Sequence, residues 1–426
     1  MVFVRNAFKN TFLFLLIIFI SCVSGIKTPP NTEAEEAESP ISSSYRVQDT
    51  IKNQHQIVVG ANQTEVYIPL IGNKKIALVG NQTSVIFKNT IDQEDYVHLV
   101  DSLLSRNINI VKVFAPEHGF RGKADAAELV ADGKDIKTGI PILSLYGKQK
   151  KPSTKSLSDI ELMVFDIQDV GVRFYTYIST LHYVMQACAE NNIPVLILDR
   201  PNPNAHYIDG PTLESKHASF VGMHPIPLVH GMTIGEYAKM VNGEGWLGKG
   251  LKCDIEIIPV KNYTHSTPYH LPIRPSPNLP NDKAINLYPS LGFFEGTTIN
   301  AGRGTEYQFQ MYGSPDLTIE NYDYTYIPKP NFGAKYPKHR GEICYGQDLR
   351  KSTALDSIQL KWLFDAYNNS KNKETFFKTK SFTAHAGNEK LQQQIEQGIS
   401  LQEVRASWQE DLEKFKEKRE QYLIYK

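Results

Sequence analysis

Four clusters of polar side chains each follow an apolar run of the sequence, and they carry groups that chemistry needs. They are Gly80-Asn81-Gln82-Thr83, Pro116-Glu117-His118-Gly119, Asp166-Ile167-Gln168-Asp169 and Asp199-Arg200-Pro201-Asn202. Their carboxylates, imidazole, guanidinium and amides can transfer protons or hold a polar ligand. Each cluster alone would also suit a simple turn, where Asp and Asn are common. Four such coincidences in succession predict one shared site.

The apolar runs that precede these clusters are typical of buried β-strands. We expect strands at 75–79, 108–114, 160–167, 193–198 and 251–260, and helices at 93–106, 177–189 and 233–241. The last helix has Thr233 as its N-cap and Glu236 at capping-box spacing. Strands that alternate with helices indicate a parallel sheet with helices on both faces. Ligands of such sheets bind outside the carboxyl ends of the strands, where the four clusters fall.

Motifs and composition exclude several classes of protein. The sequence has no G-x-G-x-x-G after the first strand, no G-x-x-x-x-G-K-[ST], no G-x-S-x-G and no H-E-x-x-H, which disfavours nucleotide enzymes, α/β-hydrolases and zincins. The four cysteines form no C-x-x-C pair, so we expect neither a zinc site nor a disulfide framework. Lys plus Arg (46) equals Asp plus Glu (46), so the chain has no net positive charge that would attract a nucleic acid. We therefore predict no cofactor, no metal and no nucleic-acid partner.

The first 22 residues are typical of a signal peptide. Arg5 and Lys9 precede an apolar run at 11–20, which suits a signal core and is too short to span a bilayer. The segment Phe19-Ile20-Ser21-Cys22 resembles a bacterial lipobox, so we expect lipidation at Cys22, with an ordinary secretory signal as the alternative. Residues 23–52 are rich in Pro, Glu and Ser and are expected to form a flexible tether. The protein is thus expected to be exported to the cell envelope or periplasm and to meet the membrane only through this lipid.

The character of the sequence changes after residue 262. Six prolines between Pro268 and Pro289 predict a segment that runs over a surface in extended or turn conformations. Helices are expected at 391–397 and 401–422. We therefore predict an α/β fold, with a Rossmann-like parallel-sheet domain at 53–262 and a smaller α+β domain at 263–426 that closes a cleft.

Several long motifs carry a resemblance to a known family. They run from Phe114 to Gly122, Val164 to Tyr177, Leu198 to Pro203, Pro227 to Glu236, Pro275 to Pro280, and Phe294 to Gly304, with Ser407-Trp408 and Tyr422 to Tyr425 near the end. Together they resemble the exo-β-N-acetylmuramidase family (NamZ-type, glycoside hydrolase family 171), formerly a domain of unknown function, over about residues 72–426. The resemblance implies a site in the cleft between a Rossmann-like domain and a smaller one.

The resemblance also implies an activity. It is that of an exo-acting glycoside hydrolase, which releases terminal N-acetylmuramic acid (MurNAc) from the non-reducing end of peptidoglycan fragments such as MurNAc-GlcNAc saccharides, in cell-wall turnover or recycling. The alternative is an envelope lipoprotein that binds muropeptides without cutting them, and such a protein would not need Glu117. A carbohydrate esterase or amidase is disfavoured, because the sequence shows neither a nucleophile elbow nor a metal triad.

Three carboxylates are the predicted catalytic residues. Glycoside hydrolysis needs an acid for the leaving oxygen and support for an oxocarbenium-like centre, from a second carboxylate or from the substrate's own acetamido group. Glu117 is the predicted acid, since partial desolvation would favour its protonated form; the alternative is a structural salt bridge to Arg121. Asp166 could orient the acetamido group or activate water. Glu295 could complete the carboxylate pair, or be held in an ion pair with Arg303.

The predicted substrate-binding residues share the matched motifs. They are His118, Arg121, Gln168, Asp169, Arg173, Tyr175, Arg200, His230, Asn278 and Arg303. Muramic acid carries a lactyl carboxylate at O3, which an arginine can bind with two parallel hydrogen bonds. We favour Arg303 for this role, because its flanking glycines let the backbone approach a ligand. Structural alternatives remain for each, such as capping of the next segment or an ion pair with Arg173 for Asp169, and core packing for Tyr175.

Overall fold

The computed structural model describes residues 56–89, 93–122 and 132–426. The predicted signal peptide, the predicted lipidation site Cys22 and the whole of the predicted tether lie outside these residues. The chain from Lys52 to Lys426 forms one compact unit, so the predicted boundary at residue 262 stays a prediction. Among the described residues, no helix has both the length and the apolar character needed to cross a bilayer.

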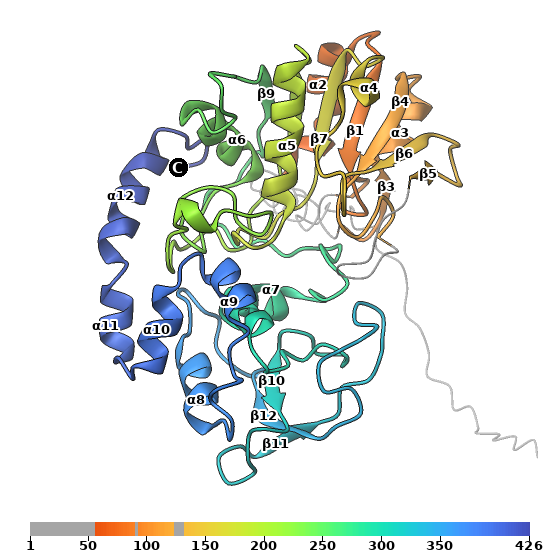
Figure 1. The fold of residues 1–426 in the computed structure, drawn as a ribbon. Helices are drawn as coiled ribbons and strands as arrows, with labels where there is room; N and C mark the ends of the chain where they lie inside the picture. Colours follow the sequence, from red (N-terminus) through yellow and green to blue (C-terminus); the bar gives the residue numbers. More distant parts are fainter. Residues whose placement is uncertain (1–55, 90–92, 123–131) are drawn as a thin grey trace, which may run out of the picture. The chain divides into compact units, whose positions relative to one another are not determined.

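A seven-stranded sheet forms the first part of the chain (Figure 1). Its order is β5 (Gly133–Lys134), β6 (Pro141–Ser144), β4 (Ile110–Ala115), β1 (Ile76–Gly80), β7 (Leu162–Asp166), β8 (Val195–Leu198) and β9 (Ile255–Ile258). All neighbours are parallel except β5 and β6. The predicted α/β class with a Rossmann-like sheet is confirmed. Each expected strand is present, although β1 is shifted by one residue and the other four are shorter than expected.

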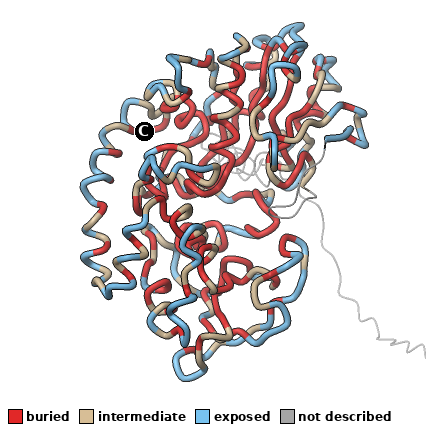
Figure 2. The backbone as a smooth tube through the Cα atoms, viewed as in Figure 1, coloured by how far each residue is buried: buried red, intermediate tan, exposed pale blue. Residues whose placement is uncertain are grey.

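Helices cover both faces of this sheet. In β1, Ala77 and Val79 belong to one apolar cluster, whereas Ile76 and Leu78 belong to another, as expected when successive side chains point to opposite faces. The first cluster includes α5 (Tyr177–Glu190) and α6 (Ile234–Gly243), and the second includes α2 (Thr64–Ile71) and α3 (Leu99–Ser105). The central strands β1, β7 and β8 are therefore buried on both sides (Figure 2). The short helices η1 (Gly60–Asn62), α4 (Thr154–Leu157) and η2 (Ser215–His217) lie in the connections.

The predicted start of one helix is confirmed, and the predicted start of another is wrong. The capping box of α6 is confirmed, with Thr233 accepting from the Glu236 amide and the Glu236 carboxylate accepting from the Thr233 amide. The helix expected at 93–106 begins later, at Leu99, and its first part is instead strand β3 (Tyr96–His98) paired with β2 (Val85–Phe87). The His98 side chain accepts from the Val100 amide as the N-cap. This cap fixes the start of the helix.

The second part of the chain is smaller and mixes helices with an antiparallel sheet. It begins with α7 (Asp282–Leu291) and η3 (Gly292–Gly296), and its sheet has the order β10 (Met311–Ser314), β12 (Cys344–Asp348), β11 (Tyr324–Tyr326). The helices α8 (Lys361–Asn369), α9 (Thr379–Ala386), α10 (Lys390–Glu396), α11 (Leu401–Ala406) and α12 (Gln409–Glu420) follow. One apolar cluster contains side chains of α5 and α6 together with Leu287, Phe293 and Phe382. The two parts therefore share a core.

Two expectations for this part need correction. The proline-rich segment does not lie over a surface, because Pro275 to Leu279 are buried and Pro289 lies inside α7. Pro289 cannot bond the carbonyl of Ile285, and the Asn204 side-chain amide donates to that carbonyl instead, at 3.2 Å. The helix expected at 401–422 is two helices, α11 and α12, separated at Ser407 and the buried Trp408.

Candidate active site

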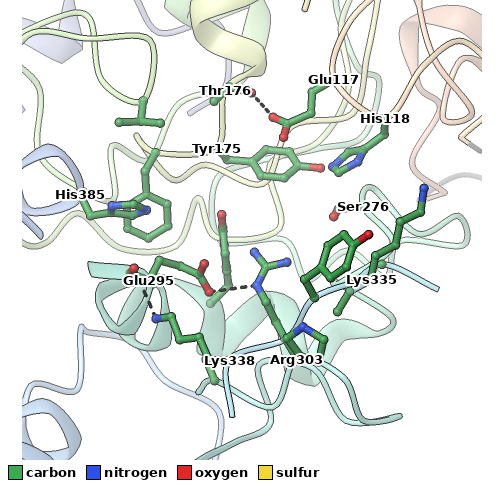
Figure 3. A pocket seen from close by; sticks show the side chains of 18 of the residues that line it. Glu117, His118, Tyr175, Thr176, Ser276, Glu295, Arg303, Lys335, Lys338 and His385 are labelled. Carbon is green, nitrogen blue, oxygen red and sulfur yellow. Dashed lines mark hydrogen bonds and ion pairs between the residues drawn. The ribbon is translucent and has the colours of Figure 1, made fainter. Parts of the chain in front are cut away.

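A pocket of about 810 Å³ lies at the carboxyl end of the sheet. One wall follows β4 and β7 and includes Glu117, His118 and the segment Phe174 to Thr176 (Figure 3). The opposite wall includes Glu295 of η3, Arg303, and the segment Gly333 to Lys338, with His385 of α9 beside Glu295. The pocket therefore draws on both parts of the chain.

Glu117 stands in a tight turn directly after β4. The Gly119 amide donates to the Pro116 carbonyl at 3.1 Å, and His118 has the unusual φ of +70°. A positive φ in a residue other than glycine is a local strain that tends to occur at functional sites. This turn directs both Glu117 and His118 into the pocket.

The Glu117 carboxylate is half-buried and has a hydroxyl donor. Thr176 is the N-cap residue of α5, but its side chain does not cap the helix. Its Oγ1 donates instead to Glu117 Oε2 at 2.9 Å. Burial and the adjacent Glu117 carboxylate raise the pKa of Tyr146, whose ring also lines the pocket. Glu117 thus lies at the pocket wall with its carboxylate oriented by a neighbour, as a proton donor requires.

Glu295 forms an ion pair with Arg303. The Arg303 Nε donates to Glu295 Oε1 at 2.9 Å, and the two side chains are 24% and 26% exposed. Burial alone would raise the pKa of Glu295, but the cations Arg303 and Lys338 outweigh it and lower the pKa to about 2. The ion pair named as the alternative for Glu295 is therefore present, and Glu295 is an anion in the pocket.

Several pocket residues were not predicted from the sequence. They are Thr176, Tyr146, Tyr288, Lys338 and His385. Burial lowers the pKa of His385, and its Nδ1 donates to the Ser381 carbonyl at 2.8 Å, so the ring is neutral near pH 7. Thr176 could have been predicted as a site residue, because it lies in the motif Phe-Tyr-Thr-Tyr177. No local pattern distinguishes Lys338 or His385 from surface residues.

Five of the predicted site residues line the pocket, namely Glu117, His118, Tyr175, Glu295 and Arg303. The Tyr175 hydroxyl donates to the Pro275 carbonyl at 2.7 Å, so this residue offers the pocket mainly its ring. The other predicted residues do not line the pocket, and each has a structural partner.

Asp166 and Arg200 bind each other beneath the pocket. Arg200 Nε and Nη2 donate to the two Asp166 oxygens at 2.6 and 2.9 Å, and both residues are buried. The predicted catalytic role of Asp166 and the predicted substrate contact of Arg200 therefore need correction. Their strands β7 and β8 are neighbours, and this places the two side chains against each other, not toward a ligand.

The side chains of Gln168 and Asp169 also bond main-chain groups of the protein. The Gln168 side-chain amide donates to the carbonyls of Asp169 and Pro201 at 2.8 and 2.6 Å. Asp169 Oδ2 accepts from the Gly171 amide at 2.6 Å, and burial raises the pKa of Asp169 to about 7. Asp169 thus caps the start of the segment that follows it, which is one of its two structural alternatives.

Arg121, His230 and Asn278 do not line the pocket, and each bonds a neighbouring group of the protein. Arg121 pairs with Asp135 and Asp101 at 2.7 and 3.1 Å. His230 is buried, its Nδ1 accepts from the Met232 amide, and burial lowers its pKa to about 3. Asn278 Nδ2 donates to the Gly333 carbonyl at 2.6 Å. These three therefore act on neighbouring protein groups, as corrections to their predicted contacts with substrate.

The Arg173 side chain bonds four main-chain carbonyls. It is fully buried, and its guanidinium donates to the carbonyls of Pro211, Ile226, His385 and Ala386 at 2.7 to 3.0 Å. A substrate carboxylate cannot reach it, which corrects its predicted role. Arg173 instead fixes the segment Phe174 to Thr176 against α9.

The pocket combines carboxylates and cations in a way that defines a class of protein. Glu117 and Glu295 come from opposite walls, with Arg303 and Lys338 beside the second. Within the described ranges, no three His, Cys, Asp or Glu side chains are placed to hold a metal ion. A pair of carboxylates that face each other across a polar cleft is typical of a glycoside hydrolase.

Comparisons with known proteins identify the family. The model of the N-terminal part of the exo-β-N-acetylmuramidase NamZ matches residues 76–283, and that of its C-terminal part matches residues 286–425. The chain therefore belongs to the exo-β-N-acetylmuramidase NamZ family, as the sequence motifs indicated. It is 37% identical to the peptidoglycan β-N-acetylmuramidase NamZ of Bacillus subtilis over 384 residues, or 84% of this chain and 89% of the relative.

Two crystal structures of DUF1343 family proteins from Bacteroides fragilis share the fold. One is 46% identical with a TM-score of 0.78, and covers 87% of this chain and 99% of its own. The other is 27% identical with a TM-score of 0.73, and covers 87% of this chain and all of its own (100%).

Proposed function

We propose that this protein is an exo-acting glycoside hydrolase that releases terminal MurNAc from the non-reducing end of peptidoglycan fragments. The observation that carries the proposal is the Glu117 carboxylate, oriented by Thr176 at the wall of the pocket, in a chain of the NamZ family. A non-catalytic muropeptide-binding protein would not need this arrangement, and the relative in Bacillus subtilis is named as a muramidase. The activity fits a role in cell-wall turnover or recycling.

In this mechanism Glu117 donates its proton to the leaving glycosidic oxygen. The Thr176 hydroxyl bonds one oxygen of the carboxylate and orients the other toward the substrate. Glu295 is the ionised carboxylate that supports the positive charge growing at the reacting carbon. It does so directly or by orienting the acetamido group of the substrate.

The charge of the pocket supports an anionic substrate. Arg303, Lys335 and Lys338 line it together with two carboxylates, Glu117 and Glu295. When Glu117 carries its proton, cations outnumber anions in the pocket. The lactyl carboxylate of MurNAc would offset part of this positive charge, and Arg303 is the residue that we assign to it.

The rim of the pocket offers a surface for the next sugar of the chain. Tyr336 is 87% exposed and Phe332 is 58% exposed, although the loop that carries them is fixed at its base. Asn278 holds the Gly333 carbonyl, and Asn331 Nδ2 donates to the Thr305 carbonyl at 2.8 Å. Aromatic rings can pack against the apolar face of a sugar. We assign Tyr336 to the N-acetylglucosamine unit that follows MurNAc.

We further propose that the protein is exported and anchored by a lipid at Cys22. The apolar run at 11–20, the lipobox-like Ser21-Cys22 and the polar segment 23–52 support this proposal. Such a tether would let the folded body reach peptidoglycan fragments in the envelope.

The decisive experiment offers the purified protein MurNAc-GlcNAc and measures free MurNAc. A GlcNAc-terminal disaccharide is the matched control, because it lacks only the lactyl group. Release of MurNAc with discrimination of about 10²-fold or more is expected, since the control sugar offers the Arg303 guanidinium no lactyl carboxylate. Absence of MurNAc release would contradict the function, and equal cleavage of both sugars would contradict the role of Arg303.

A further inference from the structure

The ammonium of Lys338 is surrounded by main-chain carbonyls. Its Nζ lies 2.7 Å from the carbonyl oxygen of Phe294, 3.4 Å from that of Glu295, 2.8 Å from that of Thr297 and 3.1 Å from that of Ile299. All four belong to the short segment Phe294 to Ile299, which carries Glu295. An ammonium has three donors on a flexible stem, so it can bond a curved row of carbonyls that a planar guanidinium matches poorly.

The residues around Lys338 extend this contact to Arg303. His339 Nε2 donates to the Thr298 carbonyl at 2.6 Å, within the same segment. The Asn300 side-chain amide donates to the carbonyls of Lys338 and Arg303 at 2.9 and 3.1 Å. Figure 3 shows the Lys338 side chain running beside Glu295 toward a main-chain oxygen. Both members of the Glu295–Arg303 pair are thus held by one loop.

The charged groups around Glu295 and Lys338 determine the charge state of both residues. Glu295 faces Arg303, Lys338 and the neutral ring of His385. Lys338 in turn faces Glu295, Arg303 and Lys378, and burial lowers its pKa to about 8. Lys338 is therefore mainly protonated at pH 7 and supplies the second cation beside Glu295.

We infer that Lys338 is a positioning residue for this reaction: it gathers the carbonyls of Phe294 to Ile299 and thereby sets where Glu295 stands against Arg303. The inference rests on the proposed function, in which Glu295 supports the reacting centre. Lys338 acts through the segment that it binds, so it is distinct from the groups assigned to the substrate.

Two variants and a control test this role. Lys338→Met removes the ammonium with little change in length, Lys338→Arg keeps the charge but changes the donor geometry, and Lys329→Met removes a charge from an exposed position of the same loop. The readouts are kcat and KM on MurNAc-GlcNAc, the melting temperature, and the acid titration of the Glu295 carboxyl by carbon NMR, assigned with Glu295→Gln.

For Lys338→Met we expect kcat to fall about 10²-fold with a smaller change in KM, as misplacement of a catalytic group typically produces. The titration midpoint of Glu295 should rise from about 2 toward the ordinary range of a glutamate. Lys338→Arg should keep the low midpoint but lose part of kcat. Lys329→Met should match the wild type.

A folded Lys338→Met with wild-type kcat and an unchanged Glu295 titration would overturn the inference. If Lys338→Met does not fold, Lys338→Arg decides, because wild-type kcat in that variant would refute the need for an ammonium. The titration requires no turnover. A wild type that releases no MurNAc would therefore refute the proposed function separately, and the position of Glu295 would still be testable.

Discussion

Arg173 and His385 are joined across 212 residues of sequence by a hydrogen bond from the guanidinium Nη2 to the His385 carbonyl, at 3.0 Å. Arg173 precedes the pocket segment Phe174 to Thr176, and His385 lines the pocket beside Glu295. The bond therefore fixes two walls of the site to each other. Since the same guanidinium bonds three further carbonyls, its loss would affect all of them.

Arg173→Met should destabilise the protein by about 3 kcal/mol or more, because it leaves several buried carbonyls without a donor. Urea denaturation monitored by fluorescence measures this change. The control is Arg350→Met, whose partner Asp348 is partly exposed and whose loss should cost at most about 1 kcal/mol. Equal effects of the two variants would contradict the structural role of Arg173.

Glu117→Gln should lower kcat on MurNAc-GlcNAc by about 10²–10⁴-fold while KM changes little, since it preserves shape but removes the acid. A nitrophenyl glycoside of MurNAc should be affected less, because its leaving group needs less protonation. Kinetics on both substrates and one melting curve check the prediction. A folded variant with near-normal turnover of the disaccharide would remove Glu117 from the mechanism.

The stability of the protein should depend on Asp169 in the acidic range. Burial raises the pKa of Asp169 to about 7, so between about pH 4 and pH 7 the folded state binds more protons than the unfolded state. Its contribution to stability is present at low pH and is lost as the pH rises through this window. Asp169→Asn should remove this dependence while keeping an acceptor for the Gly171 amide. Unfolding free energies of both proteins at pH 4.5 and 7.5 test it, and parallel pH profiles would contradict it.

Tyr336→Ala should raise KM for MurNAc-GlcNAc several-fold and leave the nitrophenyl glycoside nearly unchanged, because only the disaccharide carries the second sugar. Steady-state kinetics on the two substrates provide the measurement. Ile319→Ala is the control, since Ile319 is also exposed (64%) and does not line the pocket. Equal losses on both substrates would place Tyr336 outside the second sugar site.

Cys22→Ala should release the protein from membranes if Cys22 carries the lipid. Fractionation of cells that express each form, with an immunoblot, measures this distribution. An unchanged membrane fraction would leave the anchor without support, whereas secretion of both forms would favour an ordinary signal peptide.

The sequence predicted the sheet well because its central strands are buried on both faces and are therefore continuous apolar runs, as in Ile76–Gly80 and Val195–Leu198. The four polar clusters do gather at one edge, as expected. Their side chains, however, largely bond one another, as Asp166 and Arg200 do. Whether a polar side chain faces the ligand depends on the side chains of the neighbouring strands. It therefore cannot be predicted from the sequence of one strand alone.

The second wall was only partly predictable, for a related reason. Glu295 and Arg303 lie close in sequence and within one motif, so their pairing could be anticipated. Lys338 and His385 reach the same wall from the loop between β11 and β12 and from the helix α9, respectively. Their surroundings in sequence are polar and irregular, and only the packing of α9 and the rim loop brings them to Glu295.

The shared core has a consequence for protein engineering. Phe165 in β7 and Met185 in α5 belong to the same apolar cluster as Phe293 and Phe382 of the second part. Expressing residues 53–262 alone would expose to water the side chains of this cluster that pack against the second part, and would leave the Arg173 guanidinium without its α9 acceptors. Chimaeras between relatives should therefore take both parts of the chain from the same parent. In a chimaera that joins parts from different parents, the side chains of the shared core would not be complementary.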